Sequence, residues 1–118
     1  MRIYVNEIKI NDNQIQCYTD QPTDGLKPAE HMIVDSDNLA FVYMLDSGEQ
    51  YDYLLFVEET WSMIHENFDK EVIVNDHLIL TSFKEEMEFL LDNIADNHNY
   101  GKAFVASVEE AFELNKAE

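Results

Sequence analysis

The sequence predicts an α+β domain with a mainly antiparallel sheet built from hairpins and about three helices in its C-terminal half. Apolar residues alternate with a period of two through most of residues 2–57, and the period then changes to 3.6. No strand–helix–strand alternation is present, so strands come first and helices gather at the end. The length of 118 residues fits a single domain, residues 1–118. Counting strands does not decide whether the sheet closes partly into a barrel.

The first predicted element is a hairpin over residues 2–19. Ile3 and Val5 alternate with polar neighbours, and the same period resumes at Ile15 and Cys17. Between them, the sequence Asn-Asp-Asn supplies residues that tolerate left-handed backbone angles, as a turn requires. Residues 20–30 hold both prolines and one glycine, which predicts a loop.

The next predicted strands form two further hairpins. Residues 31–34 are a short strand, and residues 39–45 are almost wholly apolar, which indicates a strand covered on both faces. A turn then leads to a strand over residues 51–57, so that residues 39–57 form a hairpin. A second tight hairpin is predicted for residues 71–80, with its turn at Asn-Asp.

Three helices are predicted from apolar stripes at helical spacing, over residues 58–68, 83–96 and 103–115. At the start of the second helix, Ser82 and Glu85 have the spacing of a capping box. In that motif the serine hydroxyl accepts a hydrogen bond from the Glu85 amide, and the Glu85 carboxylate bonds back to the Ser82 amide.

Charge is the most unusual feature of the composition. The chain has 25 acidic and 7 basic side chains and a formal net charge of −18. Such a field repels nucleic-acid phosphates and anionic lipid, so we expect no direct binding to nucleic acid or membrane. It favours a basic protein surface as partner, although solubility alone also explains excess carboxylates. Cys17 is the only cysteine, so no intramolecular disulfide forms, and with no signal peptide or long apolar run the expected location is the cytoplasm.

The segment MIVDSDN, residues 32–38, is the clearest candidate for chemistry. If Asp35 and Asp37 lay on one strand, both carboxylates would face the same side and could bind one Mg²⁺ or Mn²⁺. A metal-dependent phosphoryl or nucleotidyl enzyme uses such a pair, but the chain has no Gly-rich phosphate loop. The alternative is a turn, because Asp, Ser and Asn all hydrogen-bond their own backbone. The turn is the preferred interpretation.

Two side-chain groups are candidates for binding a partner. Tyr43, Tyr51 and Tyr53 flank one predicted turn and form either an exposed aromatic patch or part of the core. The predicted helices also carry many carboxylates, which are either a solvated face or an imitation of a nucleic-acid backbone. These carboxylates are Glu85, Glu86, Glu88, Asp92 and Asp96 on the second helix and Glu109, Glu110 and Glu113 on the third.

Four stretches of the chain together resemble one known family. The stretches MRIYVNEIKI, MIVDSDNLAFVYMLD, VEETWSMIHEN and LDNIADNHNYGKAFVASVEEAF are spread along the chain from residue 1 to residue 112. They are similar to the small acidic YjbL-like proteins of staphylococci and bacilli, an uncharacterised family. The resemblance implies a cytoplasmic protein of a Gram-positive bacterium. It implies no reaction, cofactor or catalytic residue.

The sequence therefore favours a non-enzymatic interaction or regulatory module that binds a basic protein surface. None of the four histidines is spaced four residues from another, and the serines show no nucleophile elbow, so no cofactor is expected and an enzyme is the less favoured class. Two alternatives stay open. One is a nucleic-acid mimic that inhibits a DNA- or RNA-binding protein, and the other is the metal-dependent enzyme that would use Asp35 and Asp37.

Overall fold

A computed structural model describes residues 1–95 and 97–114 of the chain. Within these ranges the protein forms seven strands and three α-helices, and the helices all follow residue 57. The strands are β1 (Arg2–Ile10), β2 (Gln14–Thr19), β3 (Lys27–Asp35), β4 (Ala40–Asp46), β5 (Tyr51–Val57), β6 (Glu71–Val74) and β7 (Leu78–Ile79). The α-helices are α1 (Glu58–Glu66), α2 (Phe83–Ile94) and α3 (Lys102–Ala111), and 3₁₀ helices span Ser36–Asn38 and His98–Tyr100. The predicted α+β class is confirmed.

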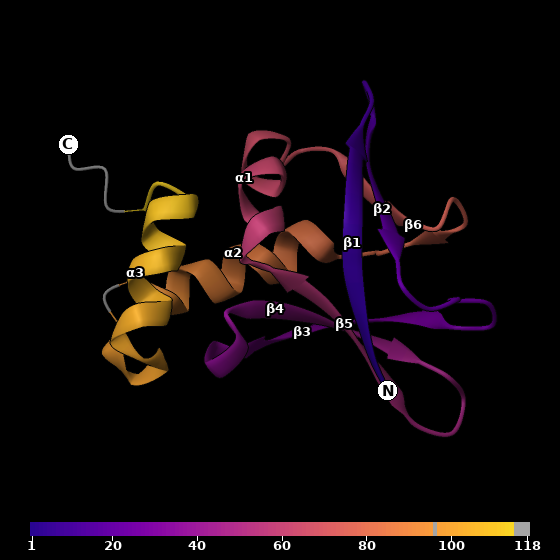
Figure 1. The fold of residues 1–118 in the computed structure, drawn as a ribbon, viewed down its shortest axis with the longest axis horizontal. Helices are drawn as coiled ribbons and strands as arrows, with labels where there is room; N and C mark the ends of the chain where they lie inside the picture. Colours follow the sequence, from indigo (N-terminus) through magenta and orange to yellow (C-terminus); the bar gives the residue numbers. More distant parts are fainter. Residues whose placement is uncertain (96, 115–118) are drawn as a thin grey trace.

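The strands form one curled sheet in the order β3-β4-β5-β1-β2-β6-β7 (Figure 1). The β1–β2, β3–β4, β4–β5 and β6–β7 pairs are antiparallel, as the predicted hairpins require. The N-terminal hairpin lies in the middle of the sheet, where β1 runs parallel to β5 and β2 runs parallel to β6. The sheet thus curls as a half-barrel, which confirms the partly closed architecture.

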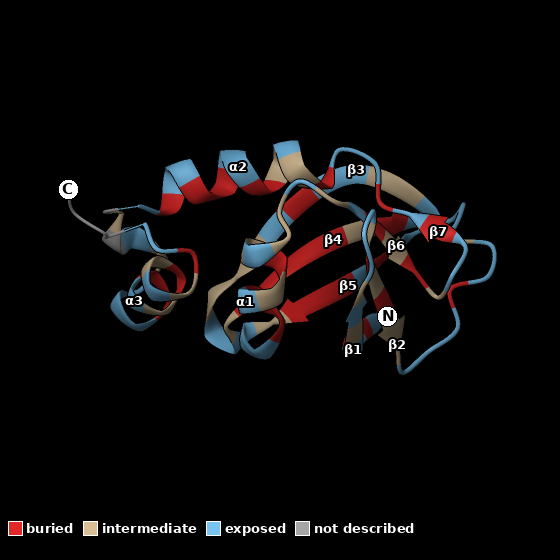
Figure 2. Cartoon of the chain, turned by 90° about the horizontal axis from the view of Figure 1, so that it is seen from above, coloured by how far each residue is buried: buried red, intermediate tan, exposed pale blue. Residues whose placement is uncertain are grey.

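The main core lies between one face of this sheet and the three helices (Figure 2). Trp61 of α1 is fully buried, with its ring centroid 5.3 Å from that of Phe41 and 5.9 Å from that of Phe104. The Trp61 indole N–H donates to the carbonyl of Phe56 at 2.9 Å, so its polar group is satisfied inside the core. Strand β4 is covered on both faces, as predicted, because Ala40 and Val42 are buried on the side opposite Phe41.

Turn chemistry explains why the predicted hairpins form where they do. In the β6–β7 turn, Asn75 and Asp76 have φ values of 51° and 66°, which these residue types tolerate better than most. The Asn11 side chain closes the β1–β2 turn by accepting hydrogen bonds from the amides of Asn13 at 2.8 Å and Gln14 at 2.6 Å. Both turns were predicted, and both are confirmed.

The predicted capping box at Ser82 is wrong. Ser82 has a φ of 61°, in the left-handed region, and its side chain makes no capping hydrogen bond. A capping serine needs extended backbone angles to place its hydroxyl near the amides of the first turn. The side chains of the first turn serve other elements instead: Lys84 pairs with Asp69, and Glu86 accepts a hydrogen bond from the amide of Met32 at 2.9 Å.

Some predicted boundaries also differ from the structure. Strand β3 begins at Lys27, inside the predicted loop, and its pairing with β4 is irregular between Pro28 and Met32. Helices α1, α2 and α3 end at Glu66, Ile94 and Ala111, earlier than predicted. The expected ends at residues 96 and 115 lie outside the described residues. Within the described ranges, no helix has the length and apolar character needed to cross a membrane.

Candidate functional site on the outer face of the sheet

The side of β3, β4, β5 and the start of β1 that points away from the core is called the outer face here. Strand register assigns to it Arg2, Tyr4, Ile33, Asp35, Val42, Tyr51, Tyr53 and Leu55. Val42 and Leu55 form an apolar floor, since they are 3% and 0% exposed. Around this floor, Tyr51 and Tyr53 are 51% and 37% exposed. The outer face therefore combines a buried apolar centre with exposed aromatic side chains.

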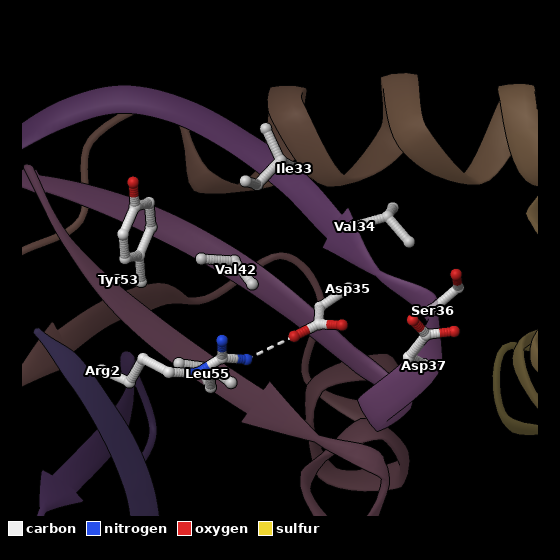
Figure 3. A pocket seen from close by; sticks show the side chains of 9 residues that line it. All are labelled: Arg2, Ile33, Val34, Asp35, Ser36, Asp37, Val42, Tyr53 and Leu55. Atoms are coloured by element: carbon white, nitrogen blue, oxygen red, sulfur yellow. Dashed lines mark hydrogen bonds and ion pairs between the residues drawn. The ribbon is translucent and has the colours of Figure 1, made fainter.

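A pocket of about 400 Å³ opens on the outer face (Figure 3). Tyr53, Val42 and Leu55 line one part of it, and the segment from Ile33 to Asp37 lines the other. Figure 3 shows Arg2 and Asp35 pointing toward each other across the pocket, joined by an ion pair. The pocket thus has an apolar part and a charged part, which suits a side chain with an apolar stem and a polar head.

The charged part of the pocket is held by hydrogen bonds around Asp35. The Asn38 amide group donates to the Asp35 carboxylate at 2.8 Å, and Arg2 binds the same oxygen. The Asn38 hydrogen bond and the neighbouring Arg2 hold the pKa of Asp35 below its usual range. In return, the hydrogen bond to Asp35 raises the pKa of Arg2. Both groups are therefore charged at neutral pH.

The structure places Asp35 and Asp37 in different kinds of backbone. Asp35 ends β3, whereas Asp37 lies in the 3₁₀ helix Ser36–Asn38 that leads into β4. The turn interpretation of this segment is confirmed, and the two-carboxylate strand geometry that the metal hypothesis needs does not form. Asp35 faces a guanidinium, which competes with a metal ion for the same oxygen. Among the described residues, no group of three or more histidine, cysteine or acidic side chains is placed to hold a metal.

The three predicted tyrosines do not form one patch. Tyr43 lies on the core face of β4, is 0% exposed, and stacks on Phe83 with ring centroids 6.3 Å apart. Its hydroxyl donates to the carbonyl of Thr81 at 2.7 Å. Tyr43 is thus a core residue, which corrects its assignment to partner binding, whereas Tyr51 and Tyr53 are exposed on the outer face. Tyr43 pairs with Leu54 of β5 and therefore shares its face of the sheet. Tyr51 and Tyr53 point to the opposite face, because successive residues of a strand alternate between the two faces.

Two of the acidic residues predicted for the third helix lie near α1, namely Glu110 on α3 and Glu113 just after its end. Glu110 and Glu113 line a hollow of about 300 Å³ together with Glu58 and Glu66 of α1. The Glu113 carboxylate lies 3.5 Å from Nε2 of His65, which also contacts the Phe112 ring edge-on. Glu109 is half-buried on α3. The predicted acidic residue Asp96 lies outside the described residues.

Cys17 offers no nucleophile. It is buried in β2, and burial raises the pKa of its thiol to about 12. A catalytic cysteine needs the opposite shift, produced by a neighbouring cation or helix N-terminus. The interpretation of Cys17 as a buried structural thiol is confirmed.

Arg2, Tyr4 and Ile33 are candidate site residues that the sequence patterns did not reveal. Arg2 and Tyr4 reach the site only because β1 inserts beside β5, a parallel pairing between segments about 50 residues apart. Such pairings leave no local periodicity to detect. The one signal available was the alternation at the N-terminus, which places residues 2 and 4 on the side opposite Ile3 and Val5.

Comparison with known proteins gives the family of the chain. Residues 3–112 match the model of UPF0738, a family of unknown function. A UPF0738 protein of Staphylococcus haemolyticus is 60% identical over 97% of this chain and 99% of its own length. Relatives from Staphylococcus saprophyticus and Staphylococcus aureus are 56% and 55% identical over 98% and 97% of this chain. No solved structure matches the chain. The chain therefore belongs to the UPF0738 family, with near-full-length relatives in staphylococci.

Proposed function

We propose that the chain is a non-enzymatic, cytoplasmic interaction module whose outer face binds a basic protein surface. The observation that carries the proposal is the group of exposed side chains Tyr51, Tyr53 and Ile33 around the buried floor of the outer face. Aromatic residues that are exposed around an apolar centre, with a polar rim, are the usual composition of a protein–protein interface.

Charge supports a basic partner. The formal net charge of −18 attracts cationic surfaces and speeds encounter with them. On the outer face itself, the charge of Arg2 is matched by Asp35, and Asp37 adds a further carboxylate to the pocket. A lysine or arginine side chain of the partner would meet apolar contacts for its stem along Tyr53 and Ile33 and carboxylates for its head.

Binding by a variant series tests this function. Wild-type chain is immobilised and exposed to a staphylococcal lysate at low and at high salt, beside the double variant Tyr51→Ser, Tyr53→Ser. Phe89→Ser serves as the matched control, because Phe89 is 65% exposed on α2. We expect a basic protein to be retained at low salt by wild type and Phe89→Ser and lost with the double variant. Equal retention by all three would contradict the proposal.

A second candidate function is mimicry of a nucleic acid. Its specific support is the hollow between α1 and α3, where Glu58, Glu66, Glu110 and Glu113 gather. A target with a nucleic-acid channel would bind carboxylates in place of phosphates. Charge reversal of Glu109, Glu110 and Glu113 to Lys should abolish inhibition of such a target, while the Tyr51→Ser, Tyr53→Ser variant should retain it. Inhibition that survives the reversal would exclude this candidate.

A further inference from the structure

Strand β1 is longer than its pairing with β5. The parallel pairing covers only Arg2 to Tyr4, whereas β1 continues to Ile10. On its other side, β1 pairs with β2 from Val5 to Ile10. Beyond Tyr4, none of the described strands pairs with the side of β1 that faces α1. Figure 1 shows this half of β1 running past the end of β5, with α1 beginning where β5 stops.

The hydrogen-bond pattern shows which backbone groups point to this open side. The amide of Asn11 donates to the carbonyl of Gln14 at 3.1 Å, so these two residues are a hydrogen-bonded pair of the antiparallel ladder. In an antiparallel ladder, hydrogen-bonded pairs alternate with pairs that are not hydrogen-bonded, so the next hydrogen-bonded pair is Lys9 with Gln16. The backbone N–H and C=O groups of Lys9 therefore also point toward β2. The N–H and C=O groups of Ile8 and Ile10 therefore point away from β2, toward the open edge.

A groove of about 360 Å³ lies beside this edge, between β1 and α1. Its apolar walls are Val5 and Ile8 of β1 and Val57 and Met63 near α1. Ile8, Val57 and Met63 are each half-buried, so the groove exposes apolar surface that continues the core.

The charged side chains of the groove have one sign. Glu7 and Glu59 line it and are exposed. Lys9 is the nearest cation in sequence, and its ammonium is 4.0 Å from the Glu7 carboxylate and 5.6 Å from the centre of the Tyr18 ring. Glu59 adds a negative charge on the opposite side of the groove.

We propose that this edge and groove bind an extended, positively charged peptide segment of another protein by β-strand addition. The backbone of the segment would pair with the outward N–H and C=O groups of Ile8 and Ile10, as peptides do at other open sheet edges. Alternate side chains of the segment would enter the apolar groove, and its basic side chains would meet Glu7 and Glu59. A second copy of this chain is the less suitable occupant, because its own Glu7 and net charge of −18 would face like charges.

This surface is separate from the outer face, so the two proposals are tested separately. The probe is the peptide acetyl-(Val-Lys)₃-amide, titrated into the ¹⁵N-labelled full-length chain, with acetyl-(Val-Glu)₃-amide as its matched control. With the lysine peptide only, we expect the NMR chemical shifts of the Ile8 and Ile10 amides to change until they saturate. We also expect slower hydrogen exchange at the same amides. The Tyr51→Ser, Tyr53→Ser variant should bind this peptide as wild type does, so failure of the outer-face proposal leaves this result unaffected.

Variants of the edge complete the test. Ile8→Pro removes one outward donor and should weaken binding roughly fivefold or more, since a net hydrogen bond contributes about 1 kcal/mol. Ile8→Val keeps the donor and should bind within about twofold of wild type. If Ile8→Pro does not fold, Met63→Lys, which places a like charge in the groove, should weaken binding instead. The proposal is overturned by shifts that do not saturate, by equal binding of both peptides, or by a concentration-dependent dimer formed through the same amides.

Discussion

At the scale of single residues, Asn75 connects the turn of β6 and β7 to the segment that follows β2. Its side-chain N–H₂ group donates to the hydroxyls of Thr19 at 2.9 Å and Thr23 at 3.1 Å, and its side-chain oxygen accepts from the Thr19 amide at 3.2 Å. Thr23 is 1% exposed, and its hydroxyl lies 2.9 Å from Nε2 of His77. Asn75 is a residue type that favours turns, and its side chain thus also provides hydrogen-bond partners for Thr19 and the buried Thr23.

Replacement of Asn75 separates these two roles. Asn75→Ala loses the side-chain hydrogen bonds. It also places alanine at a φ of 51°, a backbone angle that is unfavourable for a residue with a Cβ atom and no side-chain hydrogen bond to the backbone. We expect it to lower the free energy of unfolding by about 2–4 kcal/mol. Asn75→Gly loses only the hydrogen bonds, since glycine accepts this backbone angle, and should be less destabilised by about 1 kcal/mol. Urea unfolding of both variants measures the difference, and equal losses would show that the backbone angle carries no cost.

We expect the stability of the fold to depend on the charge of Asp35 in acid. Its pKa is lowered from 3.8 by the Asn38 hydrogen bond and by Arg2. A carboxyl group with a lowered folded-state pKa stabilises the fold above its unfolded-state pKa, and this contribution is lost as pH falls through the folded-state value. The affected window therefore lies below pH 3.8.

Thermal unfolding as a function of pH tests this assignment. Asp35→Asn should lower the melting temperature at neutral pH and should show a smaller further loss than wild type as the pH falls below 3.8. Asp12→Asn is the matched control, because Asp12 is an exposed carboxylate in the β1–β2 turn. It should follow the wild-type curve. A wild-type acid dependence in Asp35→Asn would show that other carboxylates carry the effect.

At the scale of elements, local patterns predicted most of the fold. The alternation of residues 51–57 gave strand β5 with its observed bounds, and the stripe of α2 predicted its buried positions Phe83, Met87 and Ile94. Three features escaped prediction, and the first and the last of them depend on contacts between residues distant in sequence. They are the central place of the N-terminal hairpin, the left-handed backbone of Ser82, and the outer face that Arg2 completes. The sequence identified Tyr51 and Tyr53 as candidate residues for binding a partner. It did not show that these two tyrosines are exposed while Tyr43 is buried.

Helix α2 protects the edge of β3 through one side chain. Strand β3 is the first strand of the sheet order, so its outer side has no strand neighbour among the described residues. There the Met32 amide donates to the Glu86 carboxylate at 2.9 Å, and His31 lies 3.5 Å from the same oxygen. An acidic side chain at this place satisfies a backbone donor that another strand would otherwise use.

Removal of the Glu86 carboxylate should destabilise the protein and expose the edge of β3. Glu86→Ala leaves the Met32 amide without its acceptor, and we expect a loss of about 1–3 kcal/mol in the free energy of unfolding. Hydrogen exchange at Met32 should accelerate. Glu86→Gln keeps an acceptor oxygen and should lose less. The control Glu88→Ala changes an exposed carboxylate of the same helix and should be nearly neutral. A Met32 amide that exchanges equally slowly in Glu86→Ala would contradict this role.

At the scale of the whole molecule, the curled sheet divides the surface into regions with different chemistry. The helices cover one face and form the core, and the outer face presents tyrosines around an apolar floor. Carboxylates line the hollow between α1 and α3. The charge of −18 was evident from composition, but only the fold shows where apolar surface accompanies it. This combination is the basis for proposing a basic protein partner.

Site-specific photo-crosslinking in staphylococcal cells tests the central proposal most directly. The photoreactive residue p-benzoylphenylalanine replaces Tyr53 on the outer face or, as the matched control, Phe89 on α2, since both native side chains are exposed aromatics. We expect a discrete crosslinked product between the Tyr53 position and a basic protein, with no such product from the Phe89 position. The absence of a product at Tyr53, or the same product at both positions, would contradict it.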